Sequence, residues 1–273
     1  MIASPRWIGL RYALLVGFAL MILTPFVSLV LASFHESGSA VTGLSIPETW
    51  HWKNFRLAWE QGGYSNLMRS SFIISVGVVP LVAICATLAS YAIAVLKVWG
   101  GRNLSLVFVL GLTLPVEMVA VALYFNLRNV GMTDSYLSVI LAEAGLFLPF
   151  SIYWMQAHFS SLPEELVEAA RIDGAPNLAI LTRILLPVSW PAITTMAVLV
   201  FMWSWNQFLL VIVLMQTPSM RTSPGGLGFF VGQYSTNVPL LAAATIITVL
   251  PIVVVYLVFQ RNFVSGLTQG AVK

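Results

Sequence analysis

Six long runs of apolar residues dominate this chain of 273 residues and restrict what it can fold into. Each run has 21 to 27 residues, at least the roughly 20 that an α-helix needs to cross the hydrocarbon core of a bilayer. Only 8% of the residues are charged, whereas soluble domains carry roughly a quarter. The sequence therefore predicts an all-α polytopic membrane protein. The expected spans are Tyr12–Phe34, Ser70–Leu96, Leu104–Leu127, Tyr136–Phe159, Trp190–Met215 and Pro239–Phe259.

The Lys and Arg residues between the runs indicate how the chain is oriented. With the N-terminus in the cytoplasm, eight of the 13 fall in cytoplasmic segments and five on the opposite side. This excess has the direction of the positive-inside rule. The first run is also longer than the apolar core of a cleavable signal peptide. We therefore expect it to persist as a span, with both termini in the cytoplasm.

The segment of residues 35–69 would then lie outside the cytoplasm. It contains Trp50, Trp52, Trp59 and Tyr64 among prolines and glycines. Because Trp and Tyr favour the boundary between lipid and water, this composition suits a structured cap at the membrane interface. Docking of a partner protein is the alternative interpretation, and the sequence leaves both open.

The longest cytoplasmic connection, residues 160–189, carries clear helix signals. Ser161 and Glu164 have the spacing of a capping box, which marks the start of a helix. Gly174 can adopt the positive φ that ends a helix. The sequence therefore predicts a short surface helix over Leu162–Ile172.

This short helix is expected to offer a face on which another protein can dock. Ala169 and Ala170 have little bulk and permit a close approach, while Glu168 and Arg171 provide polar anchors beside them. Apolar residues then recur at helical spacing. A second helix should therefore pack against the membrane bundle through Ile180, Leu181, Ile184 and Leu185.

Three separated segments, in order along the chain, resemble one family of transport proteins. Glu168-Ala169-Ala170, Gly174 and Ile184-x-Leu186-Pro187 are similar to the EAA loop of importer permeases of the ATP-binding-cassette (ABC) superfamily. Trp203-Ser204-Trp205-Asn206-Gln207-Phe208 resembles the family's W-N-x-F stretch, and Gly266–Lys273 resembles its C-terminal tail. The fuller pattern, LPxELxEAARIDGA followed by ILLP, is similar to the carbohydrate-uptake subgroup, in particular to the second permease of maltose-type systems.

The resemblance implies the type I ABC importer permease fold, with about six transmembrane helices in the plasma (inner) membrane of a bacterium. It also implies three parts. Residues 1–65 would form the N-terminal tail, the first transmembrane helix and an extracytoplasmic loop. Residues 66–261 would form the core permease domain of five transmembrane helices, including the EAA coupling loop at 160–187. Residues 262–273 would form a cytoplasmic tail.

The resemblance further implies that the chain forms half of a translocation pathway for a sugar, expected to be a di- or oligosaccharide, and couples to a separate ATPase. The expected partners are a homologous permease in a heterodimer, two copies of a cytoplasmic ABC ATPase and an extracytoplasmic sugar-binding protein. Residues implied to contact the ATPase from the coupling loop are Glu164, Glu168, Ala169, Ala170, Arg171, Asp173, Gly174, Ile184, Leu186 and Pro187. Those implied in the tail are Gly266, Thr268, Gln269, Gly270 and Lys273.

A few polar residues inside the spans are candidates for the substrate path. Glu117 follows a proline in the third span, and a carboxylate there costs several kcal/mol if it faces lipid. In the fifth span, Trp203, Trp205, Asn206 and Gln207 combine stacking surfaces with amides that could bind a sugar. Interhelical hydrogen bonding is the alternative for all of them.

The chain shows no signature of its own catalysis. No G-x-x-x-x-G-K-[ST] loop occurs, and Gly225-Gly226-Leu227-Gly228 lacks the lysine of such a loop. His35, His51 and His158 form no metal-binding pair, and Cys85 lies alone in an apolar run. We therefore expect no catalytic residue, metal or cofactor on this chain, with ATP and Mg bound by the partner ATPase. No cluster of basic and aromatic residues suggests nucleic acid.

Alternative functions remain open at this stage. A secondary transporter driven by an ion gradient would favour several intramembrane acids and inverted repeats. The chain shows two isolated intramembrane glutamates and no obvious repeat. An ABC importer permease for a non-sugar solute, such as a glycerophosphodiester, would carry the same coupling loop. Hydropathy alone is also compatible with a membrane scaffold.

Overall fold

The fold is almost entirely helical in a computed structural model that describes residues 5–232 and 235–269, with side chains described mainly between Arg11 and Arg261. The chain divides into two compact units. One combines Met1–Ser65 with Gly225–Leu250, and the other combines Asn66–Pro224 with Pro251–Lys273. Within the described residues, β structure is limited to one isolated bridge between Val231 and Thr236.

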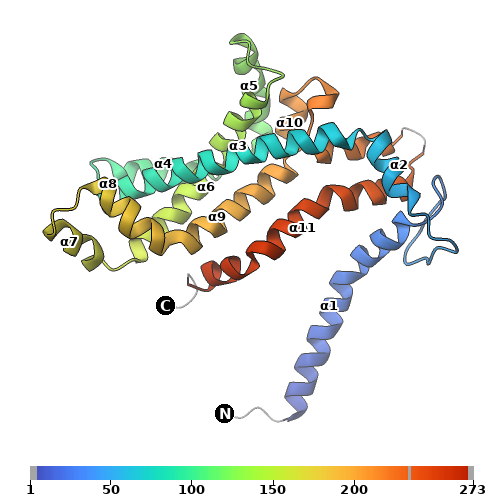
Figure 1. Cartoon of the computed structure of the whole chain (residues 1–273), viewed down its shortest axis with the longest axis horizontal. Coiled ribbons are helices and arrows are strands. Elements are labelled where there is room, and N and C mark those ends of the chain that lie inside the picture. Colours follow the sequence, from blue (N-terminus) through green and yellow to red (C-terminus); the bar gives the residue numbers. More distant parts are fainter. Residues whose placement is uncertain (1–4, 233–234, 270–273) are drawn as a thin grey trace. The chain divides into compact units, whose positions relative to one another are not determined.

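Most helices follow one another with short connections, whereas a long irregular segment joins α1 to α2 (Figure 1). Two short π-helical segments, η1 and η2, continue or precede longer helices, and η3 and η4 are 3₁₀ turns. The elements in order are α1 (Pro5–Ser33), α2 (Lys53–Gln61), α3 (Tyr64–Ser90), η1 (Tyr91–Val95), α4 (Gly101–Gly111), α5 (Val116–Asn129), α6 (Tyr136–Ser161), α7 (Glu165–Ile172), α8 (Asn177–Ala179), η2 (Ile180–Leu185), α9 (Leu186–Asn206), α10 (Leu209–Leu214), η3 (Pro218–Met220), η4 (Ser223–Phe230) and α11 (Val238–Gln269).

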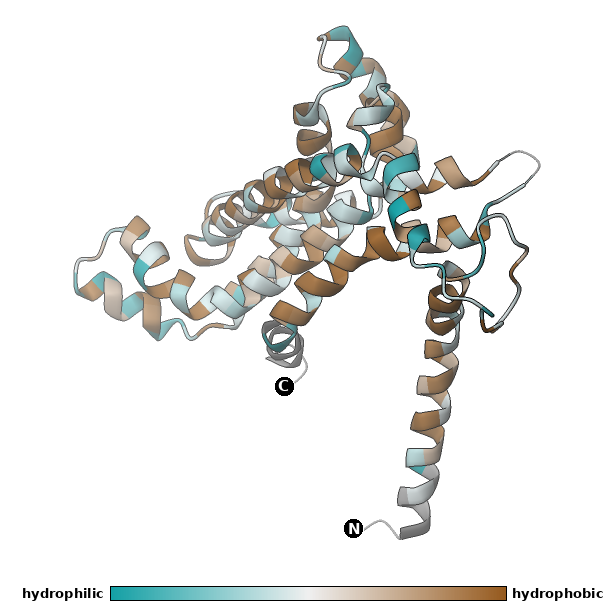
Figure 2. Ribbon diagram, turned by 45° about the vertical axis from the view of Figure 1, so that its right-hand side comes forward, coloured by the Kyte–Doolittle hydropathy of each residue, from teal (hydrophilic) through white to brown (hydrophobic). Residues whose placement is uncertain are grey.

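Five helical segments are long and apolar enough to cross a membrane, and a bent pair makes a sixth if it is counted as one span. This confirms the expected polytopic helical fold. Along most of its length α1 is coloured as hydrophobic (Figure 2), and its most apolar window is 0% buried within this chain. An apolar helix with no covering inside its own chain needs lipid or another protein around it.

Two of the expected spans differ from single straight helices. The third is broken into α4 and α5, which meet at 101°, because Pro115 takes an extended conformation at the start of α5 and interrupts the helix. The fifth begins earlier than expected, at Asn177, and its helix ends at Asn206. The Gln207 side chain then accepts hydrogen bonds from the backbone N–H groups of Leu209 and Leu210 and starts α10.

The core of the larger unit lies where α3, α6 and α9 meet. Ile74 and Val78 of α3, Met155 of α6 and Met196 of α9 are completely buried in one cluster. Gly77 permits the close approach of α3 to α6, since a Cβ atom there would lie 2.5 Å from Cδ1 of Ile140. Small residues at helix contacts are typical of membrane proteins, whose helices associate through close packing.

Hydroxyl groups join the same helices to their neighbours. Ser70 lies 2.9 Å from the Tyr136 hydroxyl of α6, and Ser90 donates to the Ile152 carbonyl at 2.9 Å. Ser71 accepts a hydrogen bond of 2.8 Å from the backbone N–H of Ser223. In an apolar interior such bonds satisfy polar groups that would otherwise be costly, so they fix how α3 sits against the bundle.

Asp134 fastens the connection between α5 and α6 to the segment after α10. Its carboxylate accepts hydrogen bonds from the Thr217 hydroxyl at 2.6 Å and the Thr217 backbone N–H at 3.0 Å. These bonds favour the ionised form and lower the pKa of the Asp134 carboxyl below its ordinary value of 3.8. The contact therefore stabilises the fold above that pH and is lost as the pH falls through the lowered pKa.

We expect Asp134→Asn to lower the thermal stability of the purified protein at neutral pH, by the order of 1 kcal/mol that such hydrogen bonds contribute. The difference in melting temperature from the wild type should close as the pH is lowered below the ordinary carboxyl pKa of 3.8. Thermal melts of both proteins at a series of pH values measure the loss of stability at neutral pH and its disappearance in acid. A difference that stays constant into strong acid would contradict this role of the carboxylate.

Candidate functional site

The short helix α7 ends in a well-formed C-terminal cap. Gly174 has φ +75°, its N–H donates to the Arg171 carbonyl at 3.0 Å, and the Ala175 N–H donates to the Ala170 carbonyl at 3.0 Å. These two bonds together make a Schellman motif, which requires positive φ at the glycine position. The predicted helix end at Gly174 is confirmed, and the chain leaves α7 in a fixed direction.

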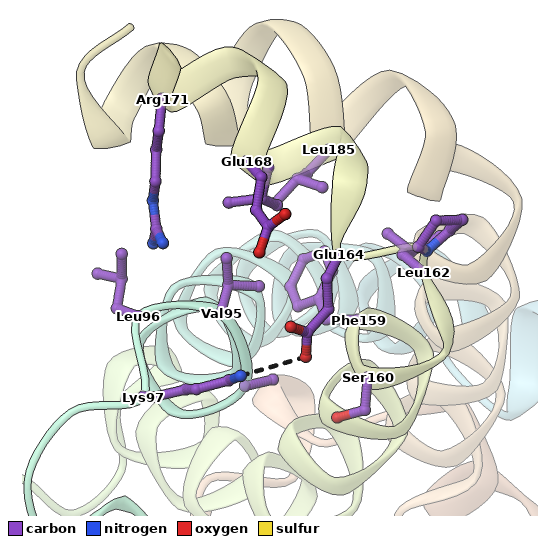
Figure 3. Close-up of a pocket in the computed structure, with 13 residues that line it drawn as sticks. Val95, Leu96, Lys97, Phe159, Ser160, Leu162, Glu164, Glu168, Arg171 and Leu185 are labelled. Carbon is purple, nitrogen blue, oxygen red and sulfur yellow. Dashed lines mark hydrogen bonds and ion pairs between the residues drawn. The ribbon is translucent and has the colours of Figure 1, made fainter. Parts of the chain in front are cut away.

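The start of α7 differs from the predicted capping box. Ser161 still belongs to α6, and its hydroxyl donates to the His158 carbonyl. Glu164 precedes the first residue of α7, and its carboxylate pairs with the Lys97 ammonium at 3.1 Å (Figure 3). The predictions of a capping box and of a helix start at Leu162 were therefore wrong, because each side chain has another partner.

A pocket of about 270 Å³ lies between α7 and the ends of η1 and α6. Apolar side chains, including Val95, Leu96 and Phe159, line it together with charged ones (Figure 3). The charged lining residues come from two elements: Lys97 follows η1, whereas Glu164, Glu168 and Arg171 are on or beside α7.

The outer surface of α7 is more apolar than the motif alone suggests. On α7, Ile172 is 86% exposed and Leu166 is also exposed, and Leu178 of the following α8 is 68% exposed. Exposed apolar residues grouped on a polar segment are typical of an interaction surface. Glu168, Ala169, Arg171, Asp173 and Gly174 are exposed as well, so most of the predicted coupling residues lie at this surface.

Ala170 takes a different position from its neighbour. It is buried in the apolar core cluster, whereas Ala169 is exposed. Successive positions on a helix are 100° apart, so neighbouring residues can face different sides of a helix that packs on one side. Ala170 therefore packs α7 against its own chain and leaves Ala169 as the small residue at the surface.

The segment after α7 is anchored on the bundle as expected. Ile180, Leu181 and Leu185 are buried, Ile184 and Leu186 are half-buried, and Pro187 is exposed. The Tyr91 hydroxyl donates to the Asn177 carbonyl at 2.9 Å, which ties this segment to η1. Both segments beside α7, η1 and η2, have π-helical geometry, a local irregularity that is frequent at functional sites.

The predicted tail residues are only partly described. Gly266, Thr268 and Gln269 belong to the last turns of α11, where the backbone is described. Gly270 and Lys273 lie outside the described residues.

The candidate path residues have different surroundings. Glu117 is exposed in the first turn of α5. Trp203 is partly exposed and meets the Phe150 ring edge-on at 4.8 Å between ring centroids, whereas Trp205 is buried. The Asn206 side chain is exposed and donates to the Met202 carbonyl of its own helix. Among the described interactions, none joins Glu117 to these fifth-span residues.

Glu143 is a polar site that the sequence did not reveal. It lies in the apolar run of the fourth expected span, and it is 0% exposed inside the bundle. Its Oε2 accepts a hydrogen bond of 2.5 Å from Ser204 of α9, and Ser204 lies 3.4 Å from Ser75 of α3. Oε1 has no hydrogen-bond partner among the described residues. The only sequence signal was a carboxylate within an apolar run.

No group of three or more His, Cys, Asp or Glu side chains suited to a metal ion occurs among the described residues. The charged groups around α7 include one ion pair, between Lys97 and Glu164. Their geometry contains no candidate nucleophile with a neighbouring base.

Comparison with known proteins gives a consistent result. Residues 83–269 match the family described as "Binding-protein-dependent transport system inner membrane component". The diacetylchitobiose uptake system permease protein NgcG of Streptomyces coelicolor is 30% identical over 97% of this chain and 89% of its own length. The arabinooligosaccharides transport system permease protein AraQ of Halalkalibacterium halodurans is 32% identical over 97% of both chains.

Two further comparisons support the same conclusion. The maltodextrin transport system permease protein MdxG of Bacillus subtilis is 31% identical over 96% of this chain and 95% of its own length. A solved bacterial ABC transporter involved in the import of the acidic polysaccharide alginate shares the fold, with a TM-score of 0.82, 21% identity and coverage of 96% of this chain and 99% of that one. The chain therefore belongs to the inner membrane components of binding-protein-dependent transport systems, the permease subunits of ABC importers.

Proposed function

We propose that this chain forms half of the translocation pathway of an ABC importer for a di- or oligosaccharide, and that α7 is its coupling helix. The observation that carries the coupling role is the geometry of α7, whose ends are fixed to the bundle while its outer surface is exposed. The substrate class rests on the relatives, whose names refer to diacetylchitobiose, arabinooligosaccharides and maltodextrin.

The contacts of α7 suit the transmission of movement. A displacement of α7 reaches α9 through η2, with which α7 packs, and reaches η1 through the hydrogen bond from Tyr91 to Asn177. Packed interiors move as units and deform little. A push on α7 by an ATPase subunit would therefore tilt the helices and rock the permease between its two states.

The remaining parts of the machine belong to other chains in this proposal. A homologous permease supplies the other half of the pathway, two ATPase subunits bind ATP and Mg, and an extracytoplasmic binding protein delivers the sugar. In this arrangement α7 and both termini face the cytoplasm of a bacterial cell, as the distribution of Lys and Arg favours.

A charge reversal at Glu168 tests the coupling role. We expect Glu168→Lys to reduce sugar uptake and binding-protein-stimulated ATPase activity of the assembled complex by about tenfold or more, as expected for loss of one charged contact in an interface. Glu168 is exposed, so the amount of folded subunit should stay unchanged. Glu168→Gln, which keeps the shape without the charge, is the matched control and should be milder. Normal uptake by the Glu168→Lys complex would sink the assignment of α7.

A truncation tests the proposed contact of the tail with the ATPase. Removal of Gly266–Lys273 should reduce the amount of ATPase that co-purifies with the permease pair, while the partner permease is retained. The measurement is a pull-down through a tag on this chain, with the tagged full-length chain alongside. Full recovery of the ATPase would assign the tail another role.

A further inference from the structure

The connection between α1 and α2 turns back along α1 in the direction of the membrane. The Ser28 hydroxyl donates to the Gly43 carbonyl at 2.6 Å. Ser28 precedes the last residue of α1, Ser33, by five positions, which is about 7 Å along a helix. Val41 and Gly43 also share a groove of about 290 Å³ with Pro25 and Ser28. The connection therefore lies beside the last turns of a helix that crosses the membrane.

The residues that follow this contact expose apolar side chains. Leu44 is 53% exposed and Ile46 is 75% exposed, and they stand one and three positions after Gly43, whose carbonyl accepts the hydrogen bond from Ser28. A single exposed apolar residue on a surface is ordinary. These two, however, lie on a segment that the hydrogen bond from Ser28 to Gly43 holds beside a transmembrane helix.

Two exposed tryptophans lie on the same connection. Phe34, the residue after α1, is buried and meets the rings of Trp50 and Trp52 at centroid distances of 5.0 and 4.6 Å. Trp52 is 69% exposed. Neither indole N–H has a hydrogen-bond partner among the described residues. A ring with an apolar body and an unused donor suits the headgroup layer, which is partly wet.

The position of this connection relative to α1 is fixed by further bonds. The Asn54 side chain donates to the Ser33 carbonyl at 2.8 Å and to the His35 carbonyl at 2.7 Å, and the His51 N–H donates to the Phe34 carbonyl at 3.0 Å. The two tryptophans are therefore fixed to the end of α1, so the depth of α1 in the bilayer also sets their depth.

The length of α1 places this level at the edge of the bilayer. The apolar segment runs from Arg11 to Ser33 and is longer than the hydrocarbon core requires. The part up to Ser28 already spans about 27 Å at the helical rise, close to the hydrocarbon thickness of about 30 Å. The last five residues of α1 and the connection then lie in the headgroup layer. Irregular backbone is tolerated there but not in the hydrocarbon core, and the exposed carboxylate of Glu48 is also compatible with that layer.

We propose that Leu44, Ile46, Trp50 and Trp52 form a membrane-interface anchor that inserts into the lipid headgroup layer at the end of α1. The anchor holds the level of α1 in the bilayer, since the two are joined by hydrogen bonds from Ser28 and Asn54. The alternative to lipid is a protein that covers this surface, either the extracytoplasmic binding protein or another subunit.

Spin labels measure the environment of this surface directly. In a Cys85→Ala background, Ile46→Cys carries the label in the full chain, purified with its associated subunits in lipid nanodiscs. Arg56→Cys is the matched control, because the Arg56 side chain is 81% exposed and carries a charge. Collision rates with oxygen, which concentrates in lipid, and with a water-soluble nickel chelate are compared at both sites.

The anchor predicts a several-fold higher ratio of oxygen to nickel collisions at residue 46 than at residue 56, unchanged when the binding protein is added. Equal nickel accessibility at the two sites would place Ile46 in water and overturn the proposal. A label at residue 46 that is immobile and reached by neither reagent would show that protein covers the surface, which also overturns it. Loss of lipid accessibility on addition of the binding protein would identify that protein as the occupant.

Discussion

Gly174→Val is expected to uncouple the transporter, with sugar uptake reduced by about tenfold or more while the subunit still inserts into the membrane. Gly174 has φ +75°, where a residue with a side chain is strained by roughly 1–2 kcal/mol and a β-branched one by more. A difference of about 1.4 kcal/mol changes an equilibrium tenfold. The strain would unwind the Schellman cap and release α7 from the position in which it can transmit movement. Uptake and stimulated ATPase activity of the reconstituted complex measure the effect.

The surroundings of Gly174 provide a matched control. Apart from the two chain neighbours, no atom of the described residues lies within 4 Å of a Cβ atom added at this position, so the first side-chain atom has room and the strain comes from the backbone. Asn is larger than Gly but tolerates positive φ. Gly174→Asn should therefore keep most of the uptake if the backbone conformation is what matters. Equal loss in both variants would contradict that explanation and indicate that a partner surface needs the absence of a side chain.

The two ends of α7 show what a local pattern can predict. The end at Gly174 depends on a property of one residue and of the backbone next to it, and the sequence predicted it correctly. The start of α7, in contrast, depends on which of several groups the Ser161 and Glu164 side chains contact. Ser161 stays in α6, and Glu164 pairs with Lys97, 67 positions earlier in the chain. A local motif cannot reveal that a distant side chain offers an alternative contact.

The same distinction applies within the membrane. Hydropathy located the apolar segments because their length reflects the thickness of the bilayer. It did not indicate the 101° bend between α4 and α5, although Pro115 marked where the helix is weak. The size of a bend is set by the helices packed around it. Gly111 at the end of α4, for example, lies close to Pro149 of α6, with 3.2 Å between an added Cβ and the proline ring.

Burial of Glu143 could not be predicted because its partner is 61 positions away on another helix. A carboxylate in an apolar run is expected to face water or protein, but the sequence does not say which. The structure places it against Ser204, at the contact of α6 with α9. This makes the Glu143 side chain part of the packing of the bundle rather than of an exposed substrate path.

Replacement of Glu143 by Ala should therefore destabilise the subunit strongly. The change leaves a cavity at a site that is 0% exposed and removes the acceptor of the Ser204 hydroxyl. Large-to-small changes in a core cost about 2–5 kcal/mol, and a buried polar group without its partner costs about 1–3 kcal/mol. Glu143→Gln retains the volume and a carbonyl acceptor, so it should melt close to the wild type. Thermal unfolding of the purified complex in detergent, followed by loss of the monodisperse peak, measures both variants. A wild-type melting temperature for Glu143→Ala would show that the buried contact between α6 and α9 contributes little to the stability of the fold.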